Sequence, residues 1–383
     1  MRKLKKKRKK EEQSLQPHKL KVIISGGGTG GHIFPAIAIA NQLMKMNSGN
    51  EILFVGANGR MEMEKVPAAG YKIEGLNISG IQRRLSLQNF LLPFKVIQSI
   101  LKAKKIIRKF NPDVVVGFGG YASGPVLFAA GKMGIPTLIQ EQNSFAGVTN
   151  RLLSKRAQKI CVAYDGMDKY FPIEKIILTG NPVREEMVRI EGKREAAMKF
   201  FGLEEGKKTI LVIGGSLGAG TINRSIAAAI KKFAGGSIQL IWQTGKAFYP
   251  QSVKVVEEYG SSGIKSFDFI QRMDYAFAAA DVVISRAGAS SVSELALVCA
   301  SSILVPSPNV AEDHQTKNAM ALVNNRAALL VKDADAEQLL IETAFVLIND
   351  KRKQEELSEN IRRMALPDAA QFIANEVYQI SKK

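Results

Sequence analysis

The chain has 383 residues, of which 46% are hydrophobic and 23% charged, a composition typical of a globular protein. It is too long for one ordinary hydrophobic core, so two domains are expected. The net charge of +19 favours anionic partners, and a membrane-spanning protein is not expected because no apolar run reaches the required ~18 residues.

Eight of the positive charges lie within the first ten residues. Residues 1–19 are predicted to form a disordered basic tail, because they hold too little apolar surface to bury. No apolar segment follows the tail, so it is not expected to be a secretory signal. The three histidines and two cysteines lack metal-ligand spacing, and no metal site is predicted.

From residue 20 the sequence alternates apolar strands with helical segments. The expected strands of the first half are 21–25, 51–55, 113–117, 137–140 and 159–162, and the expected helices are 35–46, 88–110, 124–133 and 147–153. Continuous apolar strands separated by helices predict a parallel sheet that is covered on both faces.

A glycine-rich loop, 26–31, joins the first strand to the first helix, and His32 follows it. Such a loop lets backbone N–H groups approach a phosphate at the positive end of a helix. Its spacing also fits a dinucleotide site, but the strand at 51–55 is not followed by an acidic residue for the ribose, and a P-loop would need Lys in place of His32. His32 is interpreted either as a general base for a sugar hydroxyl or as a hydrogen-bonded cap.

The first half holds three further features. A second glycine loop spans 117–124, and polar residues 141–143 follow the strand at 137–140. Residues 81–94 place large apolar side chains around two arginines, and six more basic residues follow between 95 and 109. This last segment is either a patch for an anionic membrane surface or a solvated basic face of a helix.

The pattern pauses near residues 180–184 and restarts at residue 208 with a strand, a third glycine loop at 214–220 and a helix. Later strands are expected at 238–243, 264–267, 281–285, 303–306 and 328–331, followed by a helical stretch at 354–381. These elements predict a second doubly wound domain, with a ligand cleft between the two domains.

Residues 286–294 follow one of these strands with small side chains that permit phosphate contact. Glu294 either accepts the ribose hydroxyls or completes a helix-capping box with Ser291. Residues 311–319 offer amides and a hydroxyl to a sugar. Asp333 and Asp335 have the spacing of a metal motif, but a helix cap is the favoured interpretation.

Six motifs, at 26–32, 117–124, 141–143, 181–184, 214–219 and 286–294, together resemble those of the peptidoglycan N-acetylglucosaminyltransferases of the GT-B fold, glycosyltransferase family 28. The resemblance runs from about residue 20 to the C-terminus. It implies an α/β protein with two doubly wound, Rossmann-like domains that face a cleft. Residues 20–184 would form the acceptor and membrane-facing domain and 185–365 the domain for UDP-N-acetylglucosamine (UDP-GlcNAc), with a helix at 366–383 packed back on the first.

The resemblance implies an inverting transfer of N-acetylglucosamine from UDP-GlcNAc to the 4-hydroxyl of the muramyl sugar on undecaprenyl-linked lipid I, which yields lipid II. The expected location is the cytoplasmic face of the cell membrane, as a peripheral protein on an anionic surface. No cofactor, catalytic metal or nucleic-acid partner is expected.

The resemblance also implies roles for individual residues. His32 would be the base, and the diphosphate of the acceptor would lie against Gly27, Gly28, Gly119, Gly120 and Tyr121. The donor would be bound by Thr29, Gly30, Gly31, Asn143, Arg184, Ser216, Ile270, Ala289, Ser290, Ser291, Val292, Ser293, Glu294 and Gln315. Two other interpretations stay open: a UDP-GlcNAc 2-epimerase with the same architecture, and a non-enzymatic binder of RNA or membrane that acts through the basic tail.

Overall fold

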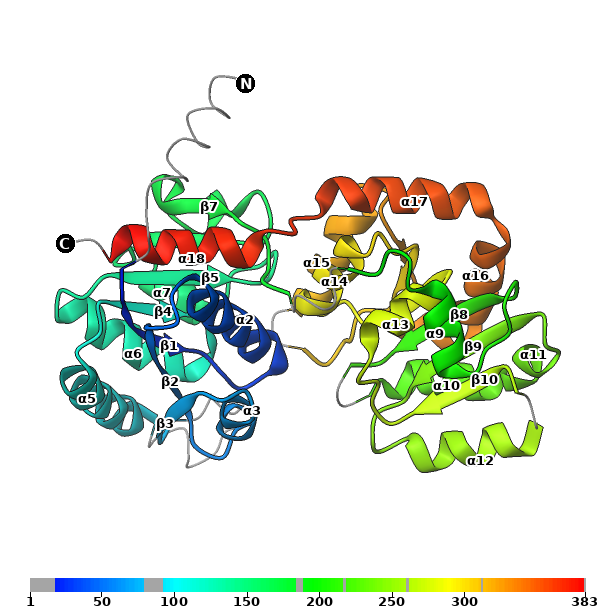
Figure 1. The fold of residues 1–383 in the computed structure, drawn as a ribbon, viewed down its shortest axis with the longest axis horizontal. Helices are drawn as coiled ribbons and strands as arrows, with labels where there is room; N and C mark the ends of the chain where they lie inside the picture. Colours follow the sequence, from blue (N-terminus) through cyan, green and yellow to red (C-terminus); the bar gives the residue numbers. More distant parts are fainter. Residues whose placement is uncertain are drawn as a thin grey trace, which may run out of the picture.

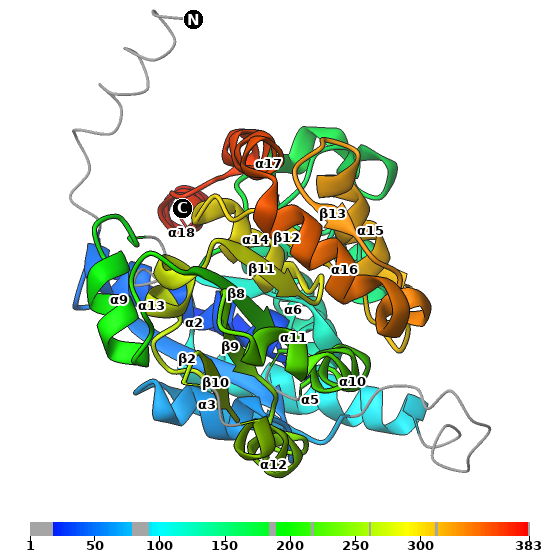
Figure 2. The same ribbon diagram turned by 90° about the vertical axis from the view of Figure 1, so that its right-hand side faces the viewer.

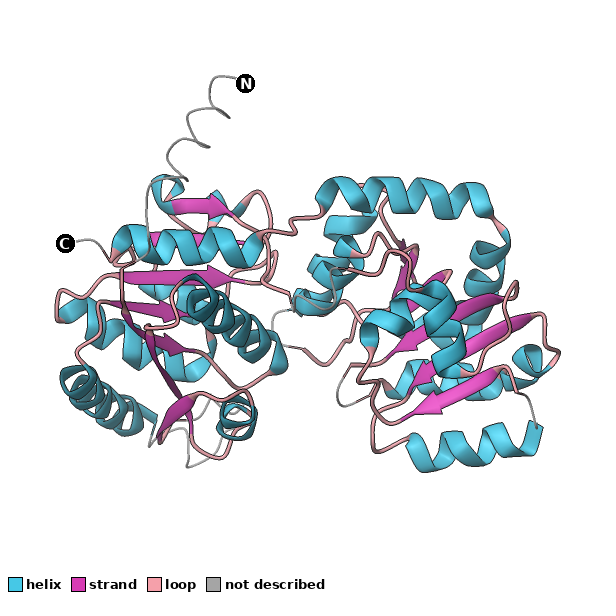
Figure 3. Ribbon diagram, viewed as in Figure 1, coloured by secondary structure: helices cyan, strands magenta, loops and turns pink. Residues whose placement is uncertain are grey.

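The computed structural model describes residues 18–78, 92–183, 189–215, 218–259, 262–310 and 313–381. The described residues form two α/β bodies side by side along the long axis of the molecule, each with helices around a central sheet (Figures 1 and 3). Viewed along that axis, the second body stands in front of the first (Figure 2).

The first sheet contains seven described strands in the order β3-β2-β1-β4-β5-β6-β7, and every neighbouring pair is parallel. The strands are β1 (Lys21–Ser25), β2 (Glu51–Ala57), β3 (Lys72–Leu76), β4 (Val114–Gly117), β5 (Thr137–Glu141), β6 (Lys159–Val162) and β7 (Ile176–Leu178). The helices between them are α2 (Gly30–Met46), α3 (Glu62–Ala68), α5 (Leu92–Phe110), α6 (Gly120–Lys132) and α7 (Val148–Leu153), with 3-10 turns η1 (Met167–Lys169) and η2 (Ile173–Lys175).

Alternate residues of these strands point to opposite faces, and each face is buried under helices. Ile23 and Val115 pack with α5, α6 and α7, whereas Val22 and Ile24 pack with α2, α3 and the C-terminal helix α18 (Ala369–Ile380). Burial on both faces explains why the strands are continuously apolar. The predicted parallel sheet with two covered faces is confirmed.

The second sheet has six described strands in the order β10-β9-β8-β11-β12-β13, again all parallel. They are β8 (Lys208–Ile213), β9 (Ile238–Gln243), β10 (Ile264–Phe267), β11 (Val282–Ser285), β12 (Ser302–Leu304) and β13 (Leu329–Leu330). The helices are α9 (Arg194–Phe201), α10 (Gly220–Ala228), α11 (Ile230–Ala234), α12 (Tyr249–Tyr259), α13 (Met273–Ala279), α14 (Ala289–Leu297), α15 (His314–Val323), α16 (Ala336–Asn349) and α17 (Lys351–Met364), with η4 (Asp333–Asp335) before α16.

The end of the chain crosses between the two bodies. Helix α17 packs on α14 and α16 of the second body, and α18 packs on α2 of the first (Figure 1). The stretch expected at 354–381 is helical, but it consists of two helices, because the helix is interrupted between Met364 and Ala369, around Pro367. The boundary expected at residues 184–185 lies outside the described residues.

Helix α2 begins at Gly30, five residues earlier than expected, and Pro35 lies inside it. Proline there costs one helical hydrogen bond, the one to the carbonyl of Gly31, and it lies close enough to the helix start to be tolerated. The earlier start places Gly30, Gly31 and His32 in the first turn of the helix rather than in the loop.

Candidate functional site

The loops that follow β1 and β4 meet at one edge of the first sheet. The strand order reverses between these two strands, and ligands of open α/β sheets bind at such a point. A Cβ atom on Gly120 would overlap the carbonyl of Gly27, and Gly120 has a left-handed φ of +79°. Both conditions require glycine. The first two glycine loops of the sequence therefore form one continuous surface.

His32 lies at the border of this surface. Its Nδ1 is 3.0 Å from the carbonyl oxygen of Gly27 and 3.2 Å from Oγ1 of Thr29, the residue that precedes α2. A carbonyl can only accept a hydrogen bond, so Nδ1 carries the proton and Nε2 keeps its lone pair. Nε2 lies close to Gly119, where an added Cβ atom would be 3.3 Å from it.

Burial lowers the pKa of His32 and is the largest influence on it. His314, at the start of α15 in the second body, lowers this pKa further, while the hydrogen bond to Gly27 and the charge of Glu62 raise it. The net effect is a neutral imidazole near pH 7, which is the form that accepts a proton. The two bodies face each other at this point, where α14 of the second body contacts α2 of the first.

Glu62, the first residue of α3, belongs to this surface although the sequence analysis did not single it out. Its side chain is 1% exposed, and its carboxylate accepts hydrogen bonds from the N–H groups of Gly28 and Ala57, each at 2.9 Å. A dinucleotide site would have an acidic residue directly after β2, and none follows there. Glu62 lies five residues after the end of β2, and its carboxylate points back to the glycine loop. The feature of the sequence that could have indicated Glu62 is an acidic residue at the start of the helix that follows the second strand.

The polar residues after β5 support the same edge of the sheet. Glu141 is 2% exposed and accepts hydrogen bonds from the N–H of Asn143 (3.1 Å), the N–H of Gly147 (3.0 Å) and Nδ2 of Asn150 (2.9 Å). Burial raises the pKa of Glu141, and these hydrogen bonds oppose that rise. Glu141 therefore fixes the loop that carries Asn143. Tyr121, in the first turn of α6, is 51% exposed.

In the second body the strand order reverses between β8 and β11, which brings the loop after β8 beside the start of α14. Helix α14 begins at Ala289 with Gly288 as its N-cap, so the capping box expected at Ser291 is wrong: Ser291 lies inside the helix. The hydroxyl of Ser290 is buried and has no hydrogen-bond partner among the described residues. A free hydroxyl beside the positive end of a helix suits an anionic ligand.

The other donor residues named from the sequence lie around this point. Val292 is buried, Glu294 is half-buried, and Ser293 donates from Oγ to the carbonyl of Ala289 at 3.0 Å. The N–H of Ile270 donates to Oε1 of Gln243 at 3.0 Å. Gln243 was not predicted as a site residue. A polar residue at the carboxyl end of a predicted strand, here β9, was the feature of the sequence that could have indicated it.

The side chain of Gln315 forms a hydrogen bond within the protein: its Oε1 accepts the N–H of Ser307 at 2.8 Å. The neighbouring Thr316 donates to Asp313 at 2.7 Å. Two other residues of the 311–319 segment, Lys317 and Asn318, contact the first body.

Asn318 joins the two bodies through its side-chain amide. Its Oδ1 accepts from the N–H (3.0 Å) and Oγ (3.1 Å) of Ser144, and its Nδ2 donates to Oδ1 of Asn143 (3.2 Å) and the carbonyl of Ala287 (3.3 Å). Next to it, the ammonium of Lys317 lies 3.3 Å from the centre of the Phe145 ring. The loop after β5 is thereby fixed to α15 and to the residues just before α14.

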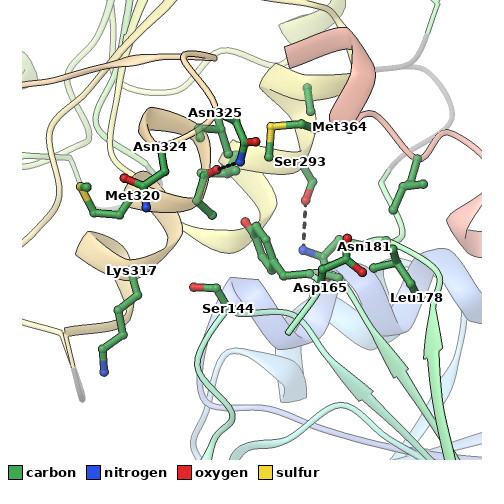
Figure 4. Close-up of a pocket in the computed structure, with 18 of the residues that line it drawn as sticks. Ser144, Asp165, Leu178, Asn181, Ser293, Lys317, Met320, Asn324, Asn325 and Met364 are labelled. Carbon is green, nitrogen blue, oxygen red and sulfur yellow. Dashed lines mark hydrogen bonds between the residues drawn. The ribbon is translucent and has the colours of Figure 1, made fainter. Parts of the chain in front are cut away.

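A cavity of about 690 Å³ lies beside this junction, between the two bodies. Figure 4 shows Ser144, Asp165 and Asn181 from the first body facing Ser293, Met320 and Asn324 from the second, with a 3.0 Å hydrogen bond from Nδ2 of Asn181 to Oγ of Ser293. The cavity borders the C-terminal half of α14, so only Val292 and Ser293 of the expected donor residues line it. It is separate from the surface at the start of α14.

Asp333 pairs with Arg286 and accepts a 3.0 Å hydrogen bond from Oγ1 of Thr221. Asp335 occupies the position before α16 but makes no capping hydrogen bond with its side chain, so the helix cap expected there is wrong. Within the described ranges, no three His, Cys, Asp or Glu side chains are grouped so as to hold a metal ion.

Three expected features lie outside the described residues: Arg184, Ser216, and residues 81–91 of the apolar segment 81–94. The basic tail is described only from His18 onward. In the parts of the chain that the structure describes, no helix has both the length and the apolar character needed to cross a bilayer.

Comparisons with known proteins extend over nearly the whole chain. Residues 22–162 match the glycosyltransferase family 28 N-terminal domain, and residues 209–373 match the glycosyltransferase family 28 C-terminal domain. A UDP-N-acetylglucosamine--N-acetylmuramyl-(pentapeptide) pyrophosphoryl-undecaprenol N-acetylglucosamine transferase of Parabacteroides distasonis is 55% identical over 365 residues, covering 95% of this chain and 99% of the relative. The enzyme of the same name from Bacteroides thetaiotaomicron is also 55% identical, covering 95% and 98%.

Among solved structures, MurG of Acinetobacter baumannii superposes with a TM-score of 0.75 at 29% identity, covering 94% of this chain and 99% of that one. The UDP-GlcNAc 2-epimerase of Neisseria meningitidis superposes with a TM-score of 0.65 at 17% identity, covering 94% and 100%, which is a likeness of fold alone. The predicted fold class, two Rossmann-like domains of the GT-B type, is confirmed by these matches.

Proposed function

Since the chain belongs to glycosyltransferase family 28, we propose that it catalyses the reaction named for its relatives. It is an N-acetylglucosaminyltransferase that moves the sugar from UDP-GlcNAc to the muramyl-pentapeptide of lipid I and forms lipid II, a step of peptidoglycan synthesis. The observation that carries this proposal is 55% identity over 95% of the chain and 99% of the relative.

The donor is held by the second body. The start of α14 offers unpaired backbone N–H groups and the buried hydroxyl of Ser290 to the diphosphate. Glu294, further along the same helix, is the ribose residue, and the loop at Ile270 accommodates the uracil. Arg184, Ser216 and Gln315 are further donor residues in this proposal, and Thr29, Gly30, Gly31 and Asn143 of the first body complete the set.

The acceptor enters on the side of the first body, where the joined glycine loops receive its diphosphate through donors other than the N–H of Gly28, which Glu62 already binds. Nε2 of His32 takes the proton of the 4-hydroxyl as the oxygen attacks the anomeric carbon. The new bond joins this oxygen to that carbon, the bond from the carbon to the phosphate oxygen breaks, and UDP leaves from the opposite face, so the configuration inverts. The positive end of α14 stabilises the charge that develops on the leaving diphosphate. No cofactor or metal takes part in these steps.

Helix α5 is the proposed membrane contact. Phe94, Ile97 and Leu101 are 72%, 58% and 60% exposed, and their spacing places them on one face of the helix. Lys105 and Arg108 continue that face and are also exposed. An apolar stripe that ends in basic residues suits the surface of an anionic membrane, and it points to the cytoplasmic leaflet.

The direct test combines purified protein, radiolabelled UDP-GlcNAc and a lipid I analogue in the presence of EDTA. We expect label in a disaccharide lipid, at a rate that EDTA does not change. An absence of lipid product, or formation of UDP-N-acetylmannosamine without any acceptor, would overturn the proposal.

The membrane contact is tested with the triple variant Phe94→Ser, Ile97→Ser, Leu101→Ser. Each exposed apolar side chain contributes about 1–3 kcal/mol when buried, so binding to vesicles containing anionic lipid should fall at least a hundredfold. Transfer to a water-soluble acceptor should stay unchanged. Full vesicle binding by the variant would contradict the role of α5.

A further inference from the structure

Glu62 is a buried carboxylate that touches the glycine loop before α2. It is 1% exposed, and its two oxygens accept the N–H groups of Gly28 and Ala57 at 2.9 Å each. A carboxylate is rarely buried to this degree without a partner of opposite charge. Here two charge-assisted hydrogen bonds from the backbone hold it.

The chain makes room for this carboxylate at two glycines. A Cβ atom on Gly27 would overlap Oε1 of Glu62, and a Cβ atom on Gly56 would overlap its Cγ. Gly27 is in the loop and Gly56 is in β2. The carboxylate of Glu62 therefore lies between two backbone segments that have no side chain at the point of contact. The glycines of this loop therefore accommodate a side chain of the protein as well as any ligand.

The hydrogen bonds of Glu62 have a consequence for His32. Glu62 fixes Gly28 from one side, and the neighbouring Gly27 directs its carbonyl at Nδ1 of His32 at 3.0 Å. That carbonyl keeps the proton on Nδ1 and leaves the lone pair on Nε2. The other group within hydrogen-bond distance of Nδ1 is Oγ1 of Thr29, at 3.2 Å, and a hydroxyl can donate as well as accept, so it does not fix the tautomer when the Gly27 carbonyl turns away. The other tautomer, with Nε2 protonated, would then be permitted.

We propose that Glu62 is a positioning residue for the base: it holds the 26–29 loop so that Gly27 fixes His32 in the tautomer that can accept a proton at Nε2. This inference rests on the proposed function, in which His32 is the base. It extends that function by adding a carboxylate that acts through the backbone rather than by touching the imidazole.

The charged groups that face His32 give the proposal a distinctive readout. Glu62 on α3 raises the pKa of His32, and His314 on α15 lowers it, while burial lowers it most. Loss of the Glu62 charge should therefore lower the pKa of the base and move the acid limb of the rate profile to lower pH. A purely structural defect would reduce the rate without moving that limb.

The experiment compares Glu62→Gln with Glu64→Gln. Glu64 lies two residues further on the same helix, its side chain is 78% exposed, and it pairs with Lys65. For Glu62→Gln we expect kcat to fall roughly tenfold to a hundredfold, which is part of the 10²–10⁴ that a general base supplies, with the acid limb of kcat/KM at lower pH. Glu64→Gln removes the same charge away from the loop and should match the wild type in both measurements.

Two further measurements keep the test decisive. Nitrogen-15 NMR of the histidine rings should show His32 protonated at Nδ1 in the wild type and a mixture of tautomers in Glu62→Gln, whether or not substrate turns over. Affinity for UDP, measured by calorimetry, should be unchanged, because the proposed diphosphate and uracil contacts lie at the start of α14 and at Ile270 in the other body, and Glu62 bonds Gly28 rather than a residue proposed for the donor. If Glu62→Gln does not fold, Gly56→Ala displaces the carboxylate from within β2 and should give the same tautomer mixture.

The outcomes separate the two claims. An inactive wild type would overturn the proposed function and leave the tautomer measurement to test Glu62. An active wild type, together with an unchanged tautomer and an unmoved acid limb in Glu62→Gln, would overturn the role of Glu62 alone. A parallel loss of UDP binding in both Glu62→Gln and Gly56→Ala would also overturn it, because Glu62 would then support the whole fold.

Discussion

The two bodies have the same strand–glycine loop–helix arrangement at their sheet edges, but they use it differently. In the first, the N–H of Gly28 is bonded to Glu62, and the carbonyl of Gly27 is bonded to His32. In the second, the hydroxyl of Ser290 at the start of α14 is buried without a partner among the described residues. One edge is occupied by a carboxylate of the protein, and the other has a polar group available to a ligand.

This difference teaches how one topology serves two tasks. A helix start with open donors binds an anion, whereas a loop whose donors are already bonded is rigid and can orient a side chain. The first edge therefore suits the proton acceptor, and the second suits the nucleotide. The predictions below alter each edge in turn.

The largest effect is expected from His32→Ala. The variant removes the only proton acceptor proposed for the 4-hydroxyl, so kcat should fall by about 10²–10⁴-fold, while the affinity for UDP-GlcNAc stays within about twofold. Steady-state kinetics with a lipid I analogue and calorimetry with the donor measure the two quantities. A variant with wild-type kcat would show that the imidazole is only a cap.

Ser290→Asp places a carboxylate at the sheet edge of the second body, as Glu62 does at the sheet edge of the first. The new carboxylate at the start of α14 would repel the diphosphate and compete for the same N–H groups, so the Kd for UDP should rise at least about tenfold, or about 1.4 kcal/mol. The melting temperature should fall only modestly, because the favourable placement of an acidic residue at a helix start opposes the cost of putting a larger, charged side chain at a buried hydroxyl. Ser290→Ala, which removes one hydroxyl without adding charge, is the control and should weaken binding only severalfold. Wild-type affinity in Ser290→Asp would remove the start of α14 from the donor site.

Asn318→Ala tests the junction between the two edges. The change removes the hydrogen bonds that Ser144 and Ala287 make with the buried amide of Asn318. This should lower the free energy of unfolding by about 1–3 kcal/mol. Thermal denaturation should show a lower melting temperature, and small-angle scattering a more open molecule. Asn325→Ala is the matched control, because Asn325 is exposed and its amide donates to the local carbonyl of Ala321. Equal melting temperatures for the two variants would contradict a joining role for Asn318.

The smallest effect concerns pH. Because burial lowers the pKa of His32, the neutral base persists to lower pH than a free histidine would allow, and kcat/KM should fall only below that pH. His314→Gln removes the second influence that lowers this pKa, so the acid limb should move to higher pH. A limb that moves downward, or not at all, would show that His314 does not face the base. The shift is opposite in sign to that expected for Glu62→Gln.

The elements that the sequence predicted best are those buried on both faces. The strands β1, β6 and β9 have the expected bounds, because burial on two sides requires an uninterrupted apolar run. The edge strand β10 also has its expected bounds, although only its first residue, Ile264, is buried. The edge strands β3 and β7 were missed. Each lies at a border of the first sheet, where one side pairs with no strand and polar residues such as Lys72 and Glu74 are tolerated.

The sequence by itself determined the fold class, the glycine loops and the position of His32, because these depend on local properties: apolar periodicity, backbone freedom at glycine and the neighbours along the chain. The tertiary structure decided which groups meet. Glu62 reaches Gly28 across 34 positions of the chain, and Asn318 reaches Ser144 across 174. Such contacts depend on how β2 and α3 pack beside β1, and on how the two bodies face each other, and no pattern of neighbouring residues encodes that geometry.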